Sequence, residues 1–195
     1  MSVAGLLLAA GAGRRYGGPK ALAVYDGRLL VERAAAMLSA GGCTPVHVVL
    51  GAAAREIEDR ADLTGAVVVG NADWASGMGS SLRAGLRSLP QTADAVVVAL
   101  VDQPLIGAEA VRRLRSAFAR GARIAVATYD DRPGHPVLFA HETWPGVSEA
   151  AHQDAGARAY LRDHPEEVTY VDCTSTGSPV DVDTPADLTA LRPHG

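Results

Sequence analysis

Short apolar segments separated by helix-type stretches are the feature of this chain that most restricts its fold. Six of them have the length of β-strands: Val3–Ala9, Val46–Leu50, Ala66–Gly70, Ala95–Leu100, Arg123–Thr128 and Val168–Asp172. The first four segments are apolar at both odd and even positions. Strands of that kind are buried on both faces, as in a parallel sheet covered by helices. The pattern therefore predicts a parallel sheet rather than an antiparallel one with a wet face.

Helix-type stretches lie between these segments and complete the architecture. We expect helices over Leu29–Ser39, Ala53–Arg60, Ser80–Leu89, Ala108–Ala119, Ala155–Arg162 and Pro185–Leu191. The alternation predicts an α/β three-layer sandwich with a mainly parallel, Rossmann-like sheet and helices on both faces. Residues 130–146 break the rhythm with three prolines, and we expect a long excursion beside the sheet edge there. With 195 residues and no linker, we expect one domain over residues 1–195.

Charge and cysteine content exclude several classes of function. The net charge is −4 and the pI is near 5.8, whereas a protein that holds long nucleic acid usually has a basic face. Cys43 and Cys173 are far apart in the sequence, which predicts neither a disulfide framework nor a zinc site and fits a reducing cytoplasm. The apolar start has arginines after it instead of before it and is too short to span a bilayer. We therefore expect a cytoplasmic protein with no nucleic-acid or membrane partner.

Polar residues collect just after the predicted strands. Five stretches have this position: Gly11–Lys20, Asn71–Ser81, Asp102–Pro104, Arg132–Pro136 and Asp181–Asp183. In parallel α/β sheets, ligands bind beyond the carboxyl ends of the strands. The sequence therefore predicts one site built from these stretches.

The stretch "LAAGAGRRYGGPK", residues 8–20, is the most specific of them. It lacks the third glycine of a dinucleotide fingerprint, because Tyr16 stands there, and an inserted Pro19 breaks the P-loop pattern. Glycine-rich backbone can nevertheless form a nest of amides for an anion, and Arg15 and Lys20 add positive charge. The loop is thus expected to bind phosphate, most simply a triphosphate.

This stretch resembles the signature L-A-[AG]-G-x-[SG]-x-R-[MF]-G-x-x-K of MobA-like nucleotidyltransferases, and later blocks extend the resemblance over nearly the whole chain. Such enzymes move a nucleoside monophosphate from an NTP to a phosphorylated acceptor. The resemblance implies catalytic roles for Lys20, Arg15 and Asp102. It implies a nucleotide-binding set of Ala9, Ala10, Gly11, Ala12, Gly13, Arg15, Lys20, Gly79, Ser80 and Ser81. For Ser80, simple capping of a helix is an equal alternative.

Two aspartate-containing blocks predict a metal site. In "VDQP", residues 101–104, Asp102 follows a strand, where a carboxylate can hold magnesium or, alternatively, cap the next helix. The block "DVDTPADL", residues 181–188, resembles a family block that brings a second aspartate to the same metal. The expected cofactor is Mg²⁺, held by Asp102 and Asp183, with Asp181 as the substitute for Asp183.

Three further blocks resemble the MocA-type subgroup, which attaches cytidylate to molybdopterin. They are "NADWASGMGSSLRAGL", "RPGHPVLF" and "QDAGAR", and they suggest Trp74, His135 and Arg158 as acceptor-binding residues. The last block has Gln153 where glycine is usual, and Trp74 could instead be core filling.

The expected reaction transfers CMP from CTP to the phosphate of molybdenum-loaded molybdopterin and releases pyrophosphate. Ala10 favours CTP, because members that use GTP tend to have glycine there. Other possibilities are a guanylyltransferase or other NTP transferase acting on a small phosphorylated acceptor, an NAD(P)H-dependent oxidoreductase, and a non-catalytic cofactor chaperone. A transient partner would be a molybdenum hydroxylase or its chaperone.

Overall fold

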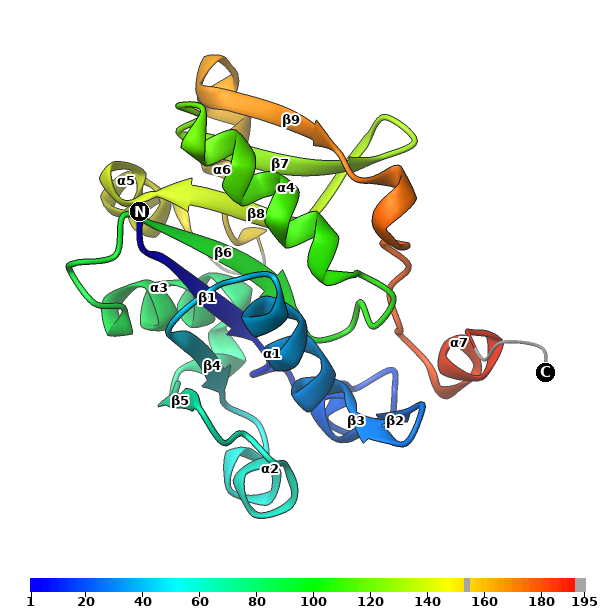
Figure 1. The fold of residues 1–195 in the computed structure, drawn as a ribbon. Coiled ribbons are helices and arrows are strands. Elements are labelled where there is room, and N and C mark those ends of the chain that lie inside the picture. The colour runs from blue at the N-terminus through cyan, green and yellow to red at the C-terminus, as the bar shows by residue number, and fades with distance from the viewer. Residues whose placement is uncertain (153–154, 192–195) are drawn as a thin grey trace.

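A seven-stranded sheet forms the middle layer of the protein (Figure 1). The computed structural model describes residues 1–152 and 155–191. The strands are β1 (Val3–Leu8), β4 (Val46–Leu50), β5 (Ala66–Gly70), β6 (Ala95–Leu100), β7 (Ile124–Tyr129), β8 (Arg132–Ala140) and β9 (Val168–Asp172). Their spatial order is β5-β4-β1-β6-β8-β7-β9, and a separate two-stranded ribbon pairs β2 (Val24–Tyr25) with β3 (Arg28–Leu29). All six predicted strands are present, and the mainly parallel α/β prediction is confirmed.

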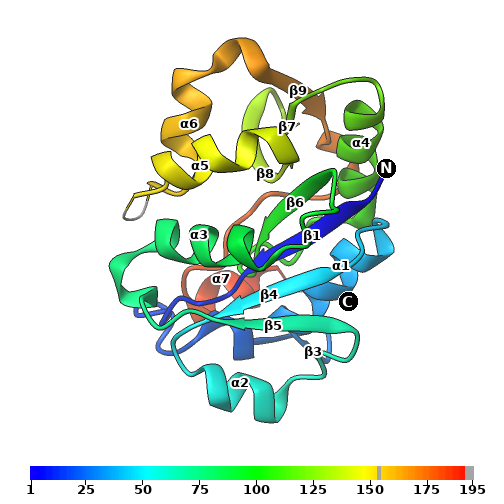
Figure 2. The same cartoon turned by 90° about the vertical axis from the view of Figure 1, so that its left-hand side faces the viewer.

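Helices cover both faces of the sheet. They are α1 (Leu30–Ala40), α2 (Ala54–Arg60), α3 (Met78–Ser88), α4 (Ala108–Ala119), α5 (Trp144–Ala150), α6 (Arg158–Asp163) and α7 (Pro185–Ala190). Figure 2 shows α1 and α4 on one side of the sheet and α3 and α5 on the other. Strand β1 divides the two cores: Leu7 packs with the α1 and α4 side, whereas Leu6 and Leu8 pack with the α3 and α5 side. This is the two-sided burial that the apolar pattern predicted for β1, β4 and β6. For β5 the same prediction was wrong: it is an edge strand, and Val67 and Val68 are exposed.

The prediction of an excursion at the sheet edge for residues 130–146 was wrong. Strand β8 lies inside the sheet and pairs antiparallel with both β6 and β7. A tight turn at Asp130 and Asp131, with φ of 48° and 61°, reverses the chain and makes this pairing possible. The prolines misled the prediction because β6 pairs only with residues 137–140. Pro133 therefore lies beyond β6, next to an irregularity in the β7 register, where a missing N–H does little harm.

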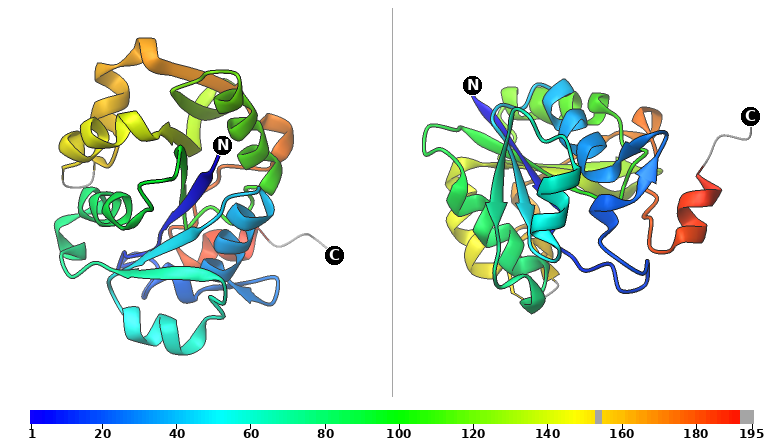
Figure 3. Two further views of the ribbon diagram at one scale, coloured as in Figure 1. Left: turned by 60° about the vertical axis from the view of Figure 1, so that its left-hand side comes forward. Right: turned by 90° about the horizontal axis from the view of Figure 1, so that it is seen from below.

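Helix α7 packs against the β2–β3 segment near the N-terminal end of the chain. Ala23, Tyr25 and Leu30 form a small apolar cluster with Val182 and Leu188, and Figure 3 shows α7 beside the β2–β3 segment. Helix α7 starts with a capping box, in which Asp187 N–H donates to the Thr184 hydroxyl and Thr184 N–H donates to the Asp187 carboxylate. This packing brings the segment before α7 against the loop that follows β1.

Among the described residues, the helices are all too short or too polar to cross a bilayer.

Candidate active site

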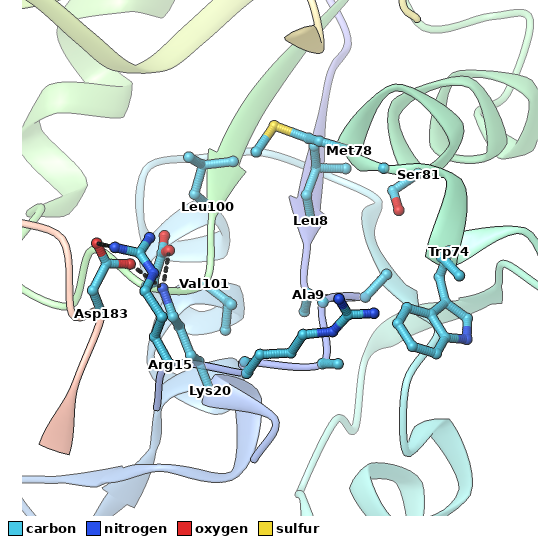
Figure 4. Close-up of a pocket in the computed structure, with 18 residues that line it drawn as sticks. Leu8, Ala9, Arg15, Lys20, Trp74, Met78, Ser81, Leu100, Val101 and Asp183 are labelled. Atoms are coloured by element: carbon cyan, nitrogen blue, oxygen red, sulfur yellow. Dashed lines mark hydrogen bonds and ion pairs between the residues drawn. The ribbon is translucent and has the colours of Figure 1, made fainter. Parts of the chain in front are cut away.

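A cavity of about 490 Å³ lies at the carboxyl ends of β1 and β6 (Figure 4). Four of the five predicted stretches contribute to its lining, together with residues at the ends of the two strands. The lining residues are Leu8, Ala9, Ala10, Gly11, Ala12, Gly13, Arg14, Arg15, Lys20, Trp74, Ala75, Gly77, Met78, Ser81, Leu100, Val101, Asp102 and Asp183. The topology explains the position, because β1 and β6 are parallel neighbours and their loops leave the same edge of the sheet.

The glycine-rich loop is closed by its own backbone. The N–H groups of Gly17 and Gly18 donate to the Gly13 carbonyl, at 2.9 and 3.2 Å. Gly13 has a φ of 60°, and a Cβ at this position would collide with the Gly18 carbonyl oxygen. A residue with a side chain could not make this turn without opening the loop, so the need for glycine at position 13 is steric as well as conformational.

An ionic cluster joins the two ends of the chain at one end of the cavity. The Lys20 ammonium donates to Asp102 Oδ2 at 2.9 Å and to Asp183 Oδ1 at 2.7 Å, and Arg15 lies 3.1 Å from Asp183 Oδ2. A backbone hydrogen bond from Val182 N–H to the Asp102 carbonyl, at 2.8 Å, fixes the two acidic segments side by side. The structure therefore gathers Lys20, Arg15, Asp102 and Asp183 around a common cavity.

Burial and pairing act in opposite directions within this cluster. Burial lowers the pKa of Lys20, but the hydrogen bonds to Asp183 and Asp102 outweigh it and the pKa is raised overall. The hydrogen bond from Lys20 is also the main reason that the pKa of Asp183 is lowered. Both partners are thus held in their charged forms.

Asp181 occupies a different environment from Asp183. Its Oδ1 accepts a hydrogen bond at 2.9 Å from Gln103 Nε2, and burial raises its pKa. Gln103, which is itself buried, also donates to the Pro179 carbonyl at 3.4 Å. Of the two aspartates, Asp183 is the one that shares the Lys20 ammonium with Asp102, whereas Asp181 is hydrogen-bonded to Gln103. Sequence reasoning did not identify Gln103 as a functional residue, although it stands inside the "VDQP" block.

The start of α3 contributes hydroxyl groups of two kinds. The Ser80 hydroxyl lies 2.9 Å from the carbonyl oxygens of Asp73 and Gly77 and donates to the backbone there. It does not cap α3, because Gly77 is the N-cap residue and Ser80 lies within the first turn of the helix. Ser81 faces the cavity instead. The buried side chain of Asn71 donates to both hydroxyls, at 2.9 and 3.0 Å, and so fixes the two serines. No role for Asn71 could be read from the motif, because its side-chain contacts depend on the fold.

Only one of the three predicted acceptor residues lies at the cavity. Trp74 lines the cavity, whereas His135 and Arg158 do not. His135 is half-buried near the start of β8, where burial lowers its pKa to about 4; the charge of Asp102 raises that pKa and the charge of Arg158 lowers it further. Arg158 is exposed at the first residue of α6. Gln153 and Asp154 of the same predicted block lie outside the described residues.

The loop before α6 approaches the cavity at Gly156. A Cβ on Gly156 would stand 3.3 Å from the sulfur of Met78, and Met78 lines the cavity.

The ionic cluster has the donors that a divalent ion prefers, although they are few. Two carboxylate oxygens accept hydrogen bonds from the Lys20 ammonium. Among residues 1–152 and 155–191 there is no group of three or more His, Cys, Asp or Glu side chains placed to hold a metal. Mg²⁺ in proteins is commonly held by one or two carboxylates, with water and substrate phosphates completing its shell. The site therefore suits an ion that arrives with a nucleotide rather than one held in a protein cage.

Residues 5–168 match the model of the MobA-like NTP transferase domain. The chain belongs to this family. The matched residues include the glycine loop and Asp102, but the match ends before Asp183. The fold places Asp183 beside them, within hydrogen-bond distance of Lys20. Among the curated relatives, nicotine blue oxidoreductase of Paenarthrobacter nicotinovorans is 45% identical over 190 residues, which cover 93% of this chain and 92% of that protein.

Solved structures of similar proteins support the same assignment. A mycobacterial protein from Mycobacterium sp. strain JC1, described as a homologue of Rv0371c, is 34% identical over 97% of this chain and 94% of that one, with a TM-score of 0.84. Rv0371c of Mycobacterium tuberculosis, solved in complex with manganese, is 28% identical over 98% of each chain, with a TM-score of 0.81. The family and the cavity together support an NTP-dependent nucleotidyltransferase.

Proposed function

We propose that this protein transfers CMP from CTP to the terminal phosphate of molybdenum-loaded molybdopterin, forming molybdopterin cytosine dinucleotide. The observation that carries this proposal is the bond that Lys20 shares between Asp102 and Asp183, beside a glycine-rich loop and at one end of an elongated cavity. Cations, backbone amides and paired carboxylates in one place are what transfer of a phosphoryl-type group requires.

In this reaction an oxygen of the acceptor phosphate attacks the α-phosphorus of CTP. The new P–O bond forms as the bond to the β-phosphate oxygen breaks, and pyrophosphate leaves with the electron pair. Lys20 and Arg15 neutralise the charge on the triphosphate and the leaving group, while the loop amides hold it in line for attack. Mg²⁺ held by Asp102 and Asp183 supplies further charge neutralisation at the phosphates when it is bound.

The substrate assignments rest on the neighbours of the ionic cluster. The buried Ala10 places a methyl group at the cavity, which favours the smaller base of CTP over that of GTP. His135 and Arg158 are the proposed acceptor contacts, because a guanidinium is suited to a phosphate group and the charges of Arg158 and Asp102 both act on the His135 imidazole. A molybdenum hydroxylase or its chaperone is the proposed recipient of the product, in the cytoplasm.

A second candidate function is favoured by one observation. The 45% identity to nicotine blue oxidoreductase extends over 92% of that protein, so reduction of a heteroaromatic compound by NAD(P)H is the alternative. Against it, the loop after β1 lacks the dinucleotide fingerprint, and a hydride transfer has no evident use for the cluster around Lys20.

One assay separates these functions. The protein is incubated with Mg²⁺, molybdenum-loaded molybdopterin and either CTP or GTP, and pyrophosphate release is measured. We expect release with CTP, a loss of more than about tenfold in kcat/KM for Asp102→Asn, and a smaller loss for the matched variant Asp181→Asn. Binding of CTP without pyrophosphate release would indicate a cofactor chaperone. Oxidation of NADH or NADPH with nicotine blue, and no pyrophosphate, would indicate the oxidoreductase.

A further inference from the structure

Trp74 lies at the end of the cavity that is remote from the ionic cluster. Figure 4 shows Trp74 and Ser81 on one side of the cavity and Lys20, Arg15 and Asp183 on the other, with Leu8 and Ala9 between them. If the triphosphate occupies the ionic end, the nucleoside must extend towards the opposite end. This position conflicts with the sequence-based assignment of Trp74 to the acceptor.

Gly51 determines where Trp74 lies. It follows β4, and a Cβ on it would collide with the Cβ of Trp74 and lie 2.7 Å from its Cγ. The same Cβ would lie 3.0 Å from the Cβ of Ala10. Trp74, Gly51 and Ala10 are therefore stacked directly on one another, with no room for a further carbon atom between them. Ala10, which is proposed to favour CTP, is thus part of the same wall as Trp74.

Backbone hydrogen bonds hold this wall in place. Ala52 N–H donates to the Ala10 carbonyl at 2.9 Å, and Asn71 N–H donates to the Leu50 carbonyl at 2.8 Å. These bonds join the loop after β1, the loop after β4 and the loop after β5 at one point. Trp74 is only partly buried against the core cluster that contains Ala10, so part of its ring remains free to face the cavity.

Ser81 adds a directed polar group at the same end. Its oxygen accepts a hydrogen bond from Asn71 Nδ2, which leaves its own proton available to donate into the cavity. A partly exposed aromatic ring next to a fixed hydroxyl donor is suited to a flat heteroaromatic ring that carries hydrogen-bond acceptors.

We propose that Trp74, positioned by Gly51, is the base-side wall of the cavity and contacts the nucleobase of the NTP rather than the acceptor. This inference rests on the proposed nucleotidyl transfer and deepens it. It makes Gly51 a positioning residue for nucleotide selection, because any larger residue there would push the indole into the space for the base.

Tryptophan fluorescence tests the proposal without acceptor and without turnover. The protein is titrated with Mg²⁺ and CTP, and separately with GTP. We expect quenching or a spectral shift in the wild type that is lost in Trp74→Phe; the other tryptophan, Trp144, is buried and donates to the Phe139 carbonyl. Trp74→Ala should weaken CTP binding about tenfold while Trp74→Phe stays within about threefold, since a base stacks on either aromatic ring.

Gly51→Ala provides a second, independent perturbation. We expect a changed Trp74 emission and weaker CTP binding, with the KM for the acceptor unchanged. Gly70→Ala is the matched control, because a Cβ on Gly70 would meet nothing within 4 Å, and it should leave both quantities unchanged. If Trp74→Ala fails to fold, the fluorescence of wild type against Trp74→Phe still decides the question.

The outcomes separate this proposal from the proposed function. A Trp74 response to GTP or another NTP, but not to CTP, supports the base wall and contradicts the CTP assignment. No Trp74 response to any NTP that binds, or an effect of Trp74→Ala on the KM for the acceptor alone, overturns the base wall and leaves nucleotidyl transfer intact.

Discussion

Lys20 occupies the space between the two carboxylates that are proposed to hold the metal, so metal and ammonium must compete for Asp102 and Asp183. In the structure the ammonium donates to both, at 2.9 and 2.7 Å. Replacing it by an uncharged residue of similar length, as in Lys20→Met, removes the competitor. The variant is therefore predicted to bind a divalent ion more tightly than the wild type when no nucleotide is present.

The geometry sets the size of this effect. A hydrogen bond to a charged group contributes about 1.5–3 kcal/mol. The lower end applies here, because the side chains of Asp102 and Asp183 are 23% and 33% exposed and water screens them. If binding of the ion breaks one of the two bonds, about 1.5 kcal/mol is recovered in the variant, which is about tenfold in the dissociation constant.

Titration with Mn²⁺, followed by electron paramagnetic resonance or calorimetry, measures the constant directly. We expect Lys20→Met to bind Mn²⁺ about tenfold more tightly and CTP more weakly, since the same side chain is proposed to hold the triphosphate. Arg15→Met is the control: the Arg15 side chain is 75% exposed, so the constant should change less than about threefold. An unchanged or weaker affinity for Mn²⁺ in Lys20→Met would refute the proposed metal site.

Three further predictions concern the loop, the pH response and the packing of α3. Gly13→Ala should destabilise the protein and abolish CTP binding because its Cβ would strike the Gly18 carbonyl, whereas Gly11→Ala, with open space around its Cβ, should retain wild-type stability in thermal melts. The pKa of His135 lies at about 4 in the fold, below its ordinary 6.5, so the unfolded chain binds more protons between these values. The free energy of unfolding should therefore fall by up to about 2.5 kcal/mol as the pH drops from 6.5 to 4, and His135→Gln should flatten this slope in urea titrations; an equal slope in both proteins would contradict the assignment. Gly85→Ala would place a Cβ within 3.1 Å of three Leu6 side-chain atoms, so α3 should separate from β1 at a cost of about 1–3 kcal/mol, and an unchanged melting temperature would contradict this.

The sheet was predictable because burial on both faces leaves a direct trace in the sequence. Segments such as Ala95–Leu100 are apolar throughout. Their alternation with helices indicated where the strands lie in the sequence and that most of them run parallel. Strand β8 was missed because its first half contains Pro133 and Pro136, and prolines indicate an edge or a loop unless the neighbouring strand is known to have ended. That information is tertiary and is not contained in a local pattern.

Site residues were predictable where they belong to one continuous motif. They were less predictable where their position depends on a contact between segments that are distant in the sequence. The glycine loop and Asp102 follow strands whose ends could be placed, and the structure puts them at one cavity with Asp183. The choice between Asp181 and Asp183 depends on Gln103, which hydrogen-bonds Asp181, and the motif gives no sign of that bond. Likewise, the contact of Trp74 with Gly51 joins residues from separate loops, and the resemblance of the Trp74 block to the MocA-type subgroup gave no sign of it.

Transfer of label from CTP tests the central claim most directly. Protein, Mg²⁺ and molybdenum-loaded molybdopterin are mixed with CTP labelled at the α-phosphate, and the pterin product and pyrophosphate are followed in one turnover. Our account predicts that the label appears on the pterin in step with pyrophosphate, and that Asp102→Asn suppresses both. Label that remains on CTP, together with unaltered behaviour of the Asp102→Asn variant, would contradict it.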